Sequence, residues 1–86
     1  MMHRRSSQAR LDESFIAHLY QRYAPGLFAY VRRQIGSQED AEDILVEVFL
    51  AASKQEHLST WPEAEQIAWL RQVTRHKLAD HYRREG

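Results

Sequence analysis

Three groups of side chains in this sequence could do chemistry: histidines, a cluster of carboxylates and a run of basic residues. The histidines could bind a metal, but His76 and His81 are five residues apart, whereas two ligands on one helical face are three or four apart. The chain has no cysteine, no HExxH motif, no phosphate-binding loop and no nucleophile elbow. We therefore expect a protein that is not an enzyme and that needs no metal and no cofactor.

The carboxylates gather in the stretch EDAEDILVEVFLAASKQ, residues 39–55, which has five acids in its first nine residues followed by the apolar run VFLAA. Asp40, Asp43 and Glu47 have the spacing i, i+3, i+7, which places them on one stripe of a helix. Acids at a helix start offset the helix dipole, and this alone explains those in the first turns. Glu47 lies deeper, so we interpret the stripe as a candidate docking surface for a basic or mixed partner helix.

The basic residues of the last third of the chain lie close to aromatic rings. Trp61, Trp69 and Tyr82 fall on or beside the same element, and rings of this kind can stack on displaced nucleic-acid bases while cations hold the backbone. The alternative is a solvated helix face with cations that suit the helix C-terminus. Trp69 is better explained as a core residue, and Trp61, in a loop, is the better candidate for exposure.

The formal net charge of zero hides three segments of different sign. Residues 1–36 carry +4, residues 37–66 carry −7 and residues 67–86 carry +3. This asymmetry indicates charged partners, unless the segments neutralise one another within the fold. No uncharged stretch approaches the ~20 residues that span a bilayer, and no apolar run follows the basic N-terminus, so we expect no membrane partner and a cytoplasmic protein.

Apolar spacing predicts three long helices. The first has apolar residues at every fourth position from Leu11 to Ile35, and Pro25 inside this pattern predicts a kink or a break near residues 24–26. Gly36 is expected to stop this helix in the left-handed conformation. Ser37 is the expected N-cap of a second helix that ends near Gln55.

The third helix is expected from Pro62 to near Arg84, after a short loop over residues 56–61. Thr60 and Glu63 have the spacing of a capping box, and proline suits the first helical turn. The fold class is therefore all-α: a small orthogonal or bundle-like domain of three long helices, the first kinked or broken near Pro25. We expect residues 1–10 to form a flexible basic tail and residues 11–86 to form the domain.

Taken together, the segments DAEDILVEVFL and WLRQVTRHKLADHYRR, in this order and separated by a short loop, resemble region 2 of bacterial RNA polymerase sigma factors of the extracytoplasmic-function group. The usual family wording is close to DAEDLVQEVFLRAW followed by WLxxIARNxxxDxxRR. The upstream LYQRYAPGLFAYVRRQIG is similar to the first helices of the family. The resemblance covers about residues 12–84 and implies a non-enzymatic transcription initiation factor domain.

The resemblance implies that the second helix docks on the clamp helices of the beta-prime subunit of core RNA polymerase. In this sequence the implied polymerase-binding residues are Asp40, Glu42, Asp43, Val46, Glu47, Phe49 and Ser53.

The resemblance also implies a role in recognising and melting the −10 promoter element. In the family, the loop, here about residues 55–61, captures a flipped base of the non-template single strand, and the next helix faces DNA. Binding energy for the extruded base offsets its unstacking, so no hydrolysis is needed. The implied DNA-binding residues are His57, Trp61, Arg71, Arg75, His76, Lys77, Arg83 and Arg84.

The sequence departs from the family wording at several of these positions. Val46 stands where Gln is usual, Ser53 where Trp is common, and His76 where the motif has Asn. Family members also continue into a second promoter-reading domain, which we do not find before Gly86. These departures leave open a protein-interaction module of the same fold that titrates or regulates polymerase without promoter binding.

Two further expectations stay open. An anti-sigma factor is a candidate partner of a domain of this kind. An unrelated helical bundle that self-associates through an exposed apolar stripe is the third interpretation of the chain.

Overall fold

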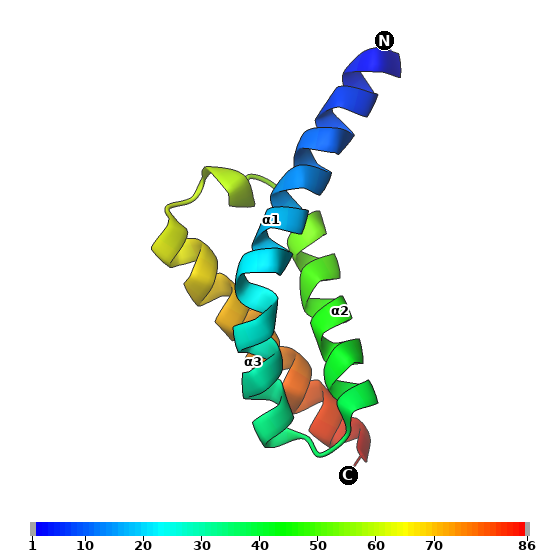
Figure 1. The fold of residues 1–86 in the computed structure, drawn as a ribbon, viewed down its shortest axis with the longest axis vertical. Helices are drawn as coiled ribbons and strands as arrows, with labels where there is room; N and C mark the ends of the chain where they lie inside the picture. Colours follow the sequence, from blue (N-terminus) through cyan, green and yellow to red (C-terminus); the bar gives the residue numbers. More distant parts are fainter. Residues whose placement is uncertain (1, 86) are drawn as a thin grey trace.

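The computed structural model describes the backbone of residues 2–85 and the side chains of residues 14–84. Within these residues the chain forms three α-helices and one short 3₁₀ helix, and it has no β-strand (Figure 1). The predicted all-α fold of three long helices is confirmed. The elements are α1 (Met2–Gln34), α2 (Gln38–Lys54), η1 (Leu58–Thr60) and α3 (Glu63–Glu85).

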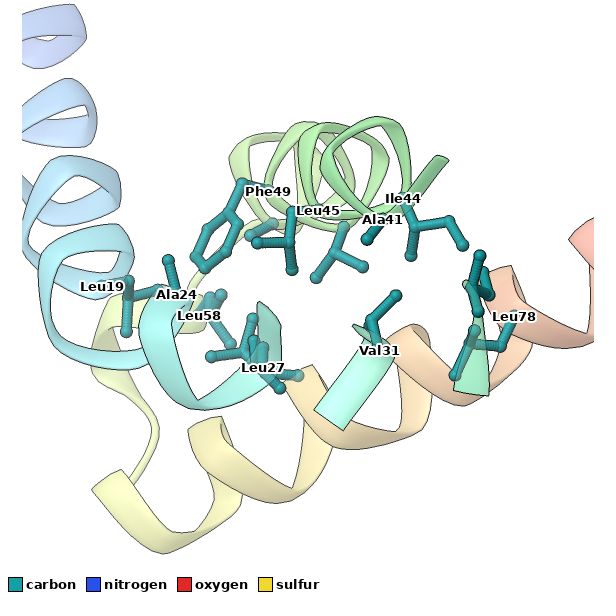
Figure 2. Close-up of a cluster of buried hydrophobic side chains, with 14 residues drawn as sticks. Leu19, Ala24, Leu27, Val31, Ala41, Ile44, Leu45, Phe49, Leu58 and Leu78 are labelled. Carbon is teal, nitrogen blue, oxygen red and sulfur yellow. The ribbon is translucent and has the colours of Figure 1, made fainter. Parts of the chain in front are cut away.

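Pro25 lies inside α1, which continues to Gln34, so the chain does not break into two helices at this point. A proline removes one backbone donor and crowds the preceding turn, and this bends a helix without ending it when both halves are packed. In Figure 2 the turns of α1 before Leu19 run in a different direction from those around Leu27 and Val31. The bend lets the second half of α1 follow the core.

Residues 2–10, predicted to be a flexible tail, form the first turns of α1. Figure 1 shows these turns extending beyond the other two helices. Met1 and the side chains of residues 2–13 lie outside the described part of the structure, so the flexibility of this segment stays a prediction.

The connection between α1 and α2 is short and held by side chains. Ser37 is the N-cap of α2, as predicted: its hydroxyl accepts a hydrogen bond from the backbone N–H of Asp40 at 3.2 Å. Gly36 does not have the positive φ expected of it. Instead, the Arg32 guanidinium donates to the carbonyls of Ile35 at 3.4 Å and Gly36 at 2.5 Å, so a side chain satisfies two carbonyls just after the end of the helix.

The core lies between the three helices, with α2 in contact with both α1 and α3 (Figure 2). α2 buries one stripe of apolar residues, which consists of Ala41, Ile44, Leu45, Val48, Phe49 and Ala52. In α3 the fully buried Thr74 donates its hydroxyl to the Leu70 carbonyl at 2.7 Å, so a polar side chain fits in an apolar seam. The buried apolar residues are Leu19, Ala24, Leu27, Val31, Ile35, Ala41, Ile44, Leu45, Val48, Phe49, Ala52, Leu58, Leu70 and Leu78.

The loop between α2 and α3 is tied to the domain by one buried amide. Gln66 donates from Nε2 to the carbonyls of Leu58 at 3.1 Å and Trp61 at 2.9 Å. The predicted capping box of Thr60 and Glu63 is not formed, because the Thr60 hydroxyl donates to the His57 carbonyl at 2.6 Å inside the loop. No helix in the described part of the chain combines the length and apolar content needed to cross a bilayer.

Candidate functional site

One surface of α2 faces away from the core, and we call it the outer face. At its centre lie Val46 and Leu50, one helical turn apart and 56% and 53% exposed. Both are among the few large apolar side chains that the described residues leave exposed. The outer face consists of Glu39, Glu42, Asp43, Val46, Leu50 and Ser53, all of them exposed.

Four of the seven predicted polymerase-binding residues lie on the outer face: Glu42, Asp43, Val46 and Ser53. Leu50 was missed by the sequence analysis, although it follows Val46 by four residues and a helical projection places it on the same side. Only the burial of each side chain reveals this exposed apolar pair, because the sequence of α2 also contains six apolar residues that are buried.

Phe49, which was predicted to belong to the docking face, is only 6% exposed. Its ring packs edge-on against the ring of Tyr20, with centroids 5.0 Å apart. The side chain therefore supports α2 from the core side and is not available to a partner. Phe49 was predicted because it lies in the family motif, but in the structure its side chain packs against α1.

Two acids of the predicted stripe, Asp40 and Glu47, face α3, and we call this contact the α2–α3 seam. Glu47 Oε1 lies 3.6 Å from Lys77 Nζ and 4.0 Å from Arg84 Nη2. Asp40 Oδ2 lies 3.7 Å from His81 Nε2. The stripe of Asp40, Asp43 and Glu47 is thus divided, since only Asp43 points to solvent away from α3.

The predicted DNA-binding residues of α3 do not share one surface. Lys77 and Arg84 lie in the seam, and Arg83 pairs with Asp80 on its own helix. Arg71, Arg75 and His76 are exposed, and the two arginines border a groove against α1. The cations that remain open to a polyanion are therefore the two arginines, with His76 farther round the helix.

The loop after α2 borders a hollow of about 470 Å³, which Phe15 and Ile16 of α1 line on the other side. His57, a predicted DNA-binding residue, lines this hollow and has a left-handed backbone with φ 66°. Trp61, which was expected to be exposed, is half-buried and packs against the core. The hollow is lined by Phe15, Ile16, Ala52, Ser53, Lys54, Gln55, Glu56, His57, Leu58, Ser59 and Thr60.

The groove between α1 and α3 has a volume of about 500 Å³ and a largely apolar floor. At its edge the Tyr23 hydroxyl donates to Glu63 Oε2 at 2.9 Å, and Arg22 Nη2 lies 3.3 Å from the same oxygen. Partial burial, reinforced by the Glu63 carboxylate, raises the pKa of Tyr23 above its ordinary value, although Arg22 acts in the opposite direction. The groove is lined by Tyr23, Gly26, Leu27, Tyr30, Ile67, Leu70, Arg71 and Arg75.

The side chains described in the structure contain no group of three or more His, Cys, Asp or Glu placed to hold a metal ion. The surfaces described above are an apolar face framed by acids, a hollow beside a loop, and a groove bordered by arginines. Surfaces of this kind bind proteins and nucleic acids.

Comparison with known proteins agrees with this description. The sigma-70 region 2 family model matches residues 19–86. The chain is 31% identical over 77 residues to the ECF RNA polymerase sigma factor BldN of Streptomyces coelicolor, a match that covers 90% of this chain and 29% of that protein. It is 41% identical over 56 residues to the ECF RNA polymerase sigma factor SigF of Caulobacter vibrioides, covering 64% of this chain and 30% of that protein.

The chain thus spans less than a third of the length of these two relatives. No solved structure matches it. The family model covers α2, the loop and α3 completely and α1 from Leu19 onward, which is the part of α1 that packs into the core. The chain belongs to the sigma-70 region 2 family.

Proposed function

We propose that this chain is a transcription initiation domain that binds core RNA polymerase through the outer face of α2 and helps to recognise and melt the −10 promoter element. The observation that carries the proposal is the pair of exposed apolar side chains, Val46 and Leu50, set among acids on a helix whose other side is buried. The proposed contact on the polymerase is the clamp helices of the beta-prime subunit. Such a domain would act in the cytoplasm, without catalysis of its own.

The outer face has the composition of a small protein-binding patch. Apolar contacts at the centre of an interface contribute most of its affinity, while a charged rim steers the encounter and selects the partner. Here Val46 and Leu50 supply the centre, and Glu42 and Asp43 supply the rim. The partner that fits is a helix pair with apolar and basic side chains.

The loop and α3 support the promoter part of the proposal. The hollow beside His57 adjoins the loop that, in the family, receives a flipped base, and Arg71 and Arg75 are exposed on the helix that follows. Extruding a base costs a few kcal/mol of unstacking and unpairing, which contacts to the base and the strand must offset. Because three of the predicted DNA-binding cations, Lys77, Arg83 and Arg84, already pair with carboxylates of the same chain, we expect weak binding of DNA by the isolated domain.

A second candidate function is a polymerase-binding module that does not bind promoter DNA. The observation that favours it is the pairing of Lys77, Arg83 and Arg84 with carboxylates of the same chain. These three cations would have to exchange internal partners for phosphates, so they contribute less to DNA affinity than free cations.

Binding of this chain to bacterial core RNA polymerase tests the first part of the proposal. We expect saturable binding that Val46→Asp weakens by about tenfold or more, because a charge at the centre of the patch is desolvated on docking. The matched control is Ala64→Asp, which adds the same charge at an exposed position in the first turn of α3. No binding by the unmodified chain, or equal loss in both variants, would exclude the outer face as the docking surface.

A single-stranded −10 oligonucleotide with a fluorescent label tests the second part, with polymerase present and absent. Promoter binding predicts an affinity that falls with salt and that Arg71→Ala and Arg75→Ala reduce. Polymerase binding without any oligonucleotide binding would select the second candidate function.

A further inference from the structure

Two surfaces of this chain are complementary to each other. The groove between α1 and α3 has an apolar floor that includes Leu27 and Leu70, and it is bordered by Arg71 and Arg75. The outer face of α2 is the reverse, an apolar ridge bordered by acids. An amphipathic helix face and an apolar groove of opposite charge are the two halves of a common mode of helix recognition.

The arginines of the groove are available for such a contact. Both are exposed, and neither makes an ion pair with another side chain that the structure describes. By contrast, Lys77 and Arg84 are already paired in the seam. The unpaired positive charge in the described part of α3 is thus concentrated beside the groove.

One molecule cannot bring its own two surfaces together. The groove is lined by α1 and α3 alone, and the outer face lies on the side of α2 that is turned away from both. Contact between the surfaces therefore requires two molecules, the outer face of one meeting the groove of the other. The formal net charge of zero means that no overall repulsion opposes this approach.

We propose that this protein self-associates head to tail, with the outer face of α2 of one copy docked in the α1–α3 groove of the next. In such a pair the first copy keeps a free groove and the second keeps a free outer face, so the contact generates open chains whose length grows with concentration. This differs from a symmetric α2–α2 dimer, in which the acids of the two copies would face each other.

Self-association would also regulate the proposed function. This regulation rests on the proposed function, whereas the self-association itself does not. Each contact covers Val46 and Leu50 of one copy, the centre of the proposed polymerase-binding face, and Arg71 and Arg75 of the other copy, proposed to meet DNA. Self-association would hold the domain in a closed state that polymerase opens by competition.

Sedimentation equilibrium of the unmodified chain, from about 10 µM to about 1 mM, is the first measurement. We expect the average mass to rise above the monomer mass of 10.2 kDa and to fall back at high salt, because the contact pairs acids with arginines. A constant monomer mass would overturn the proposal. Association that strengthens with salt would overturn it too, since that is the behaviour of acids facing acids.

Two variants, each altering one surface, locate the contact. Val46→Asp places a charge on the outer face, and Gly26→Leu fills the groove, where a Cβ on Gly26 would meet no atom within 4 Å. Each variant should remain a monomer at concentrations where the unmodified chain associates. Circular dichroism checks that both are folded.

Mixing the two variants gives the decisive result. Val46→Asp keeps an intact groove and Gly26→Leu keeps an intact outer face, so together they should form a one-to-one dimer that cannot extend. A symmetric contact, or a contact that involves neither surface, predicts no such rescue and would overturn the proposal. The measurement contains no polymerase, so its outcome is separate from that of the polymerase-binding experiment.

Discussion

The two sides of α2 carry acids of the same kind in different surroundings. In the α2–α3 seam, Glu47 lies between Lys77 and Arg84, and Asp40 lies beside His81. On the outer face, Asp43 makes no ion pair with any other side chain described in the structure. Acids that are regularly spaced in the sequence can therefore differ in the structure. Asp40 and Glu47 pair with residues of α3, whereas Asp43 is left for a partner.

A docking surface on α2 is best tested with variants that alter one side of the helix and leave the other side unchanged. Reversing the charge of Glu47 alters the contact of α2 with α3 as well as any contact with a partner. Reversing Asp43, or adding a charge at Val46 or Leu50, alters the outer face alone. Variants that separate the two sides are therefore more informative than the acid stripe as a whole.

The largest difference should appear between two adjacent apolar residues of α2. Phe49→Ala is expected to lower the free energy of unfolding by about 3–5 kcal/mol, since it removes a buried ring and leaves a cavity. Leu50→Ala, at an exposed position, should change it by less than about 0.5 kcal/mol. Urea unfolding of both variants makes the comparison. Similar losses would mean that Leu50 is not on an outer face.

The next effect concerns polymerase affinity. Leu50→Asp should weaken binding to core polymerase by about 1.4–3 kcal/mol, because it puts a charge at the centre of the docking surface. Glu47→Gln, which keeps the size of a seam residue and removes its charge, should weaken it much less. The measurement is the dissociation constant of each variant from core polymerase, compared with that of the unmodified chain. A larger loss for Glu47→Gln would assign docking to the seam edge of α2.

Charge reversal should destabilise the fold more at Glu47, which pairs with α3, than at Asp43, which lies on the outer face. Glu47→Arg brings a third cation to Lys77 and Arg84 and should cost about 1 kcal/mol at low salt, a modest figure because all three side chains are partly exposed. Asp43→Arg should cost less than about 0.5 kcal/mol. Thermal unfolding at two salt concentrations measures both. The cost of Glu47→Arg should shrink as salt rises, and restoration by Lys77→Glu in the same chain would confirm the seam pair.

The smallest effect is the titration of Tyr23, at the edge of the groove between α1 and α3. The pKa of Tyr23 is raised, so its neutral phenol is favoured in the folded state. Any stability that this contributes is present below the ordinary tyrosine pKa of 10.0 and is lost as the pH rises through the raised value. Ultraviolet absorbance of the phenolate should show a late-titrating group that Tyr23→Phe removes and Glu63→Gln moves to lower pH. An unchanged titration in Tyr23→Phe would contradict this.

Much of the fold was predictable because it depends on local patterns. The four-residue apolar spacing of the first helix, the stripe of the second and the Ser37 cap follow from helix geometry and hydrogen bonding within a few residues. The Thr60–Glu63 capping box failed because the Thr60 side chain turns into the loop, where its hydroxyl donates to the His57 carbonyl. The prediction left open whether the first helix is kinked or broken at Pro25, and α1 is one continuous helix. Local sequence could not decide between the two, because packing on both sides of the proline determines whether a helix bends or ends.

The candidate site was predicted only in part. The motif residues of α2 and α3 came from a family resemblance, which names positions and not the directions of their side chains. Phe49 lies in the core, Lys77 and Arg84 lie in the seam, and Leu50 joins the outer face, all because of where α1 and α3 pack. The groove beside Arg71 and Arg75 combines residues from two helices distant in sequence.

The sequence by itself determined which segments are helical, which apolar residues form the stripes, and the family to which the chain is similar. These properties depend on interactions within one or two helical turns, which spacing expresses directly. The tertiary structure alone decided which acids are neutralised, which apolar residues stay exposed and which arginines are left for a partner. The reason is physical: burial and ion pairing are relations between helices, and the rotation of each helix about its axis is set by packing against the others.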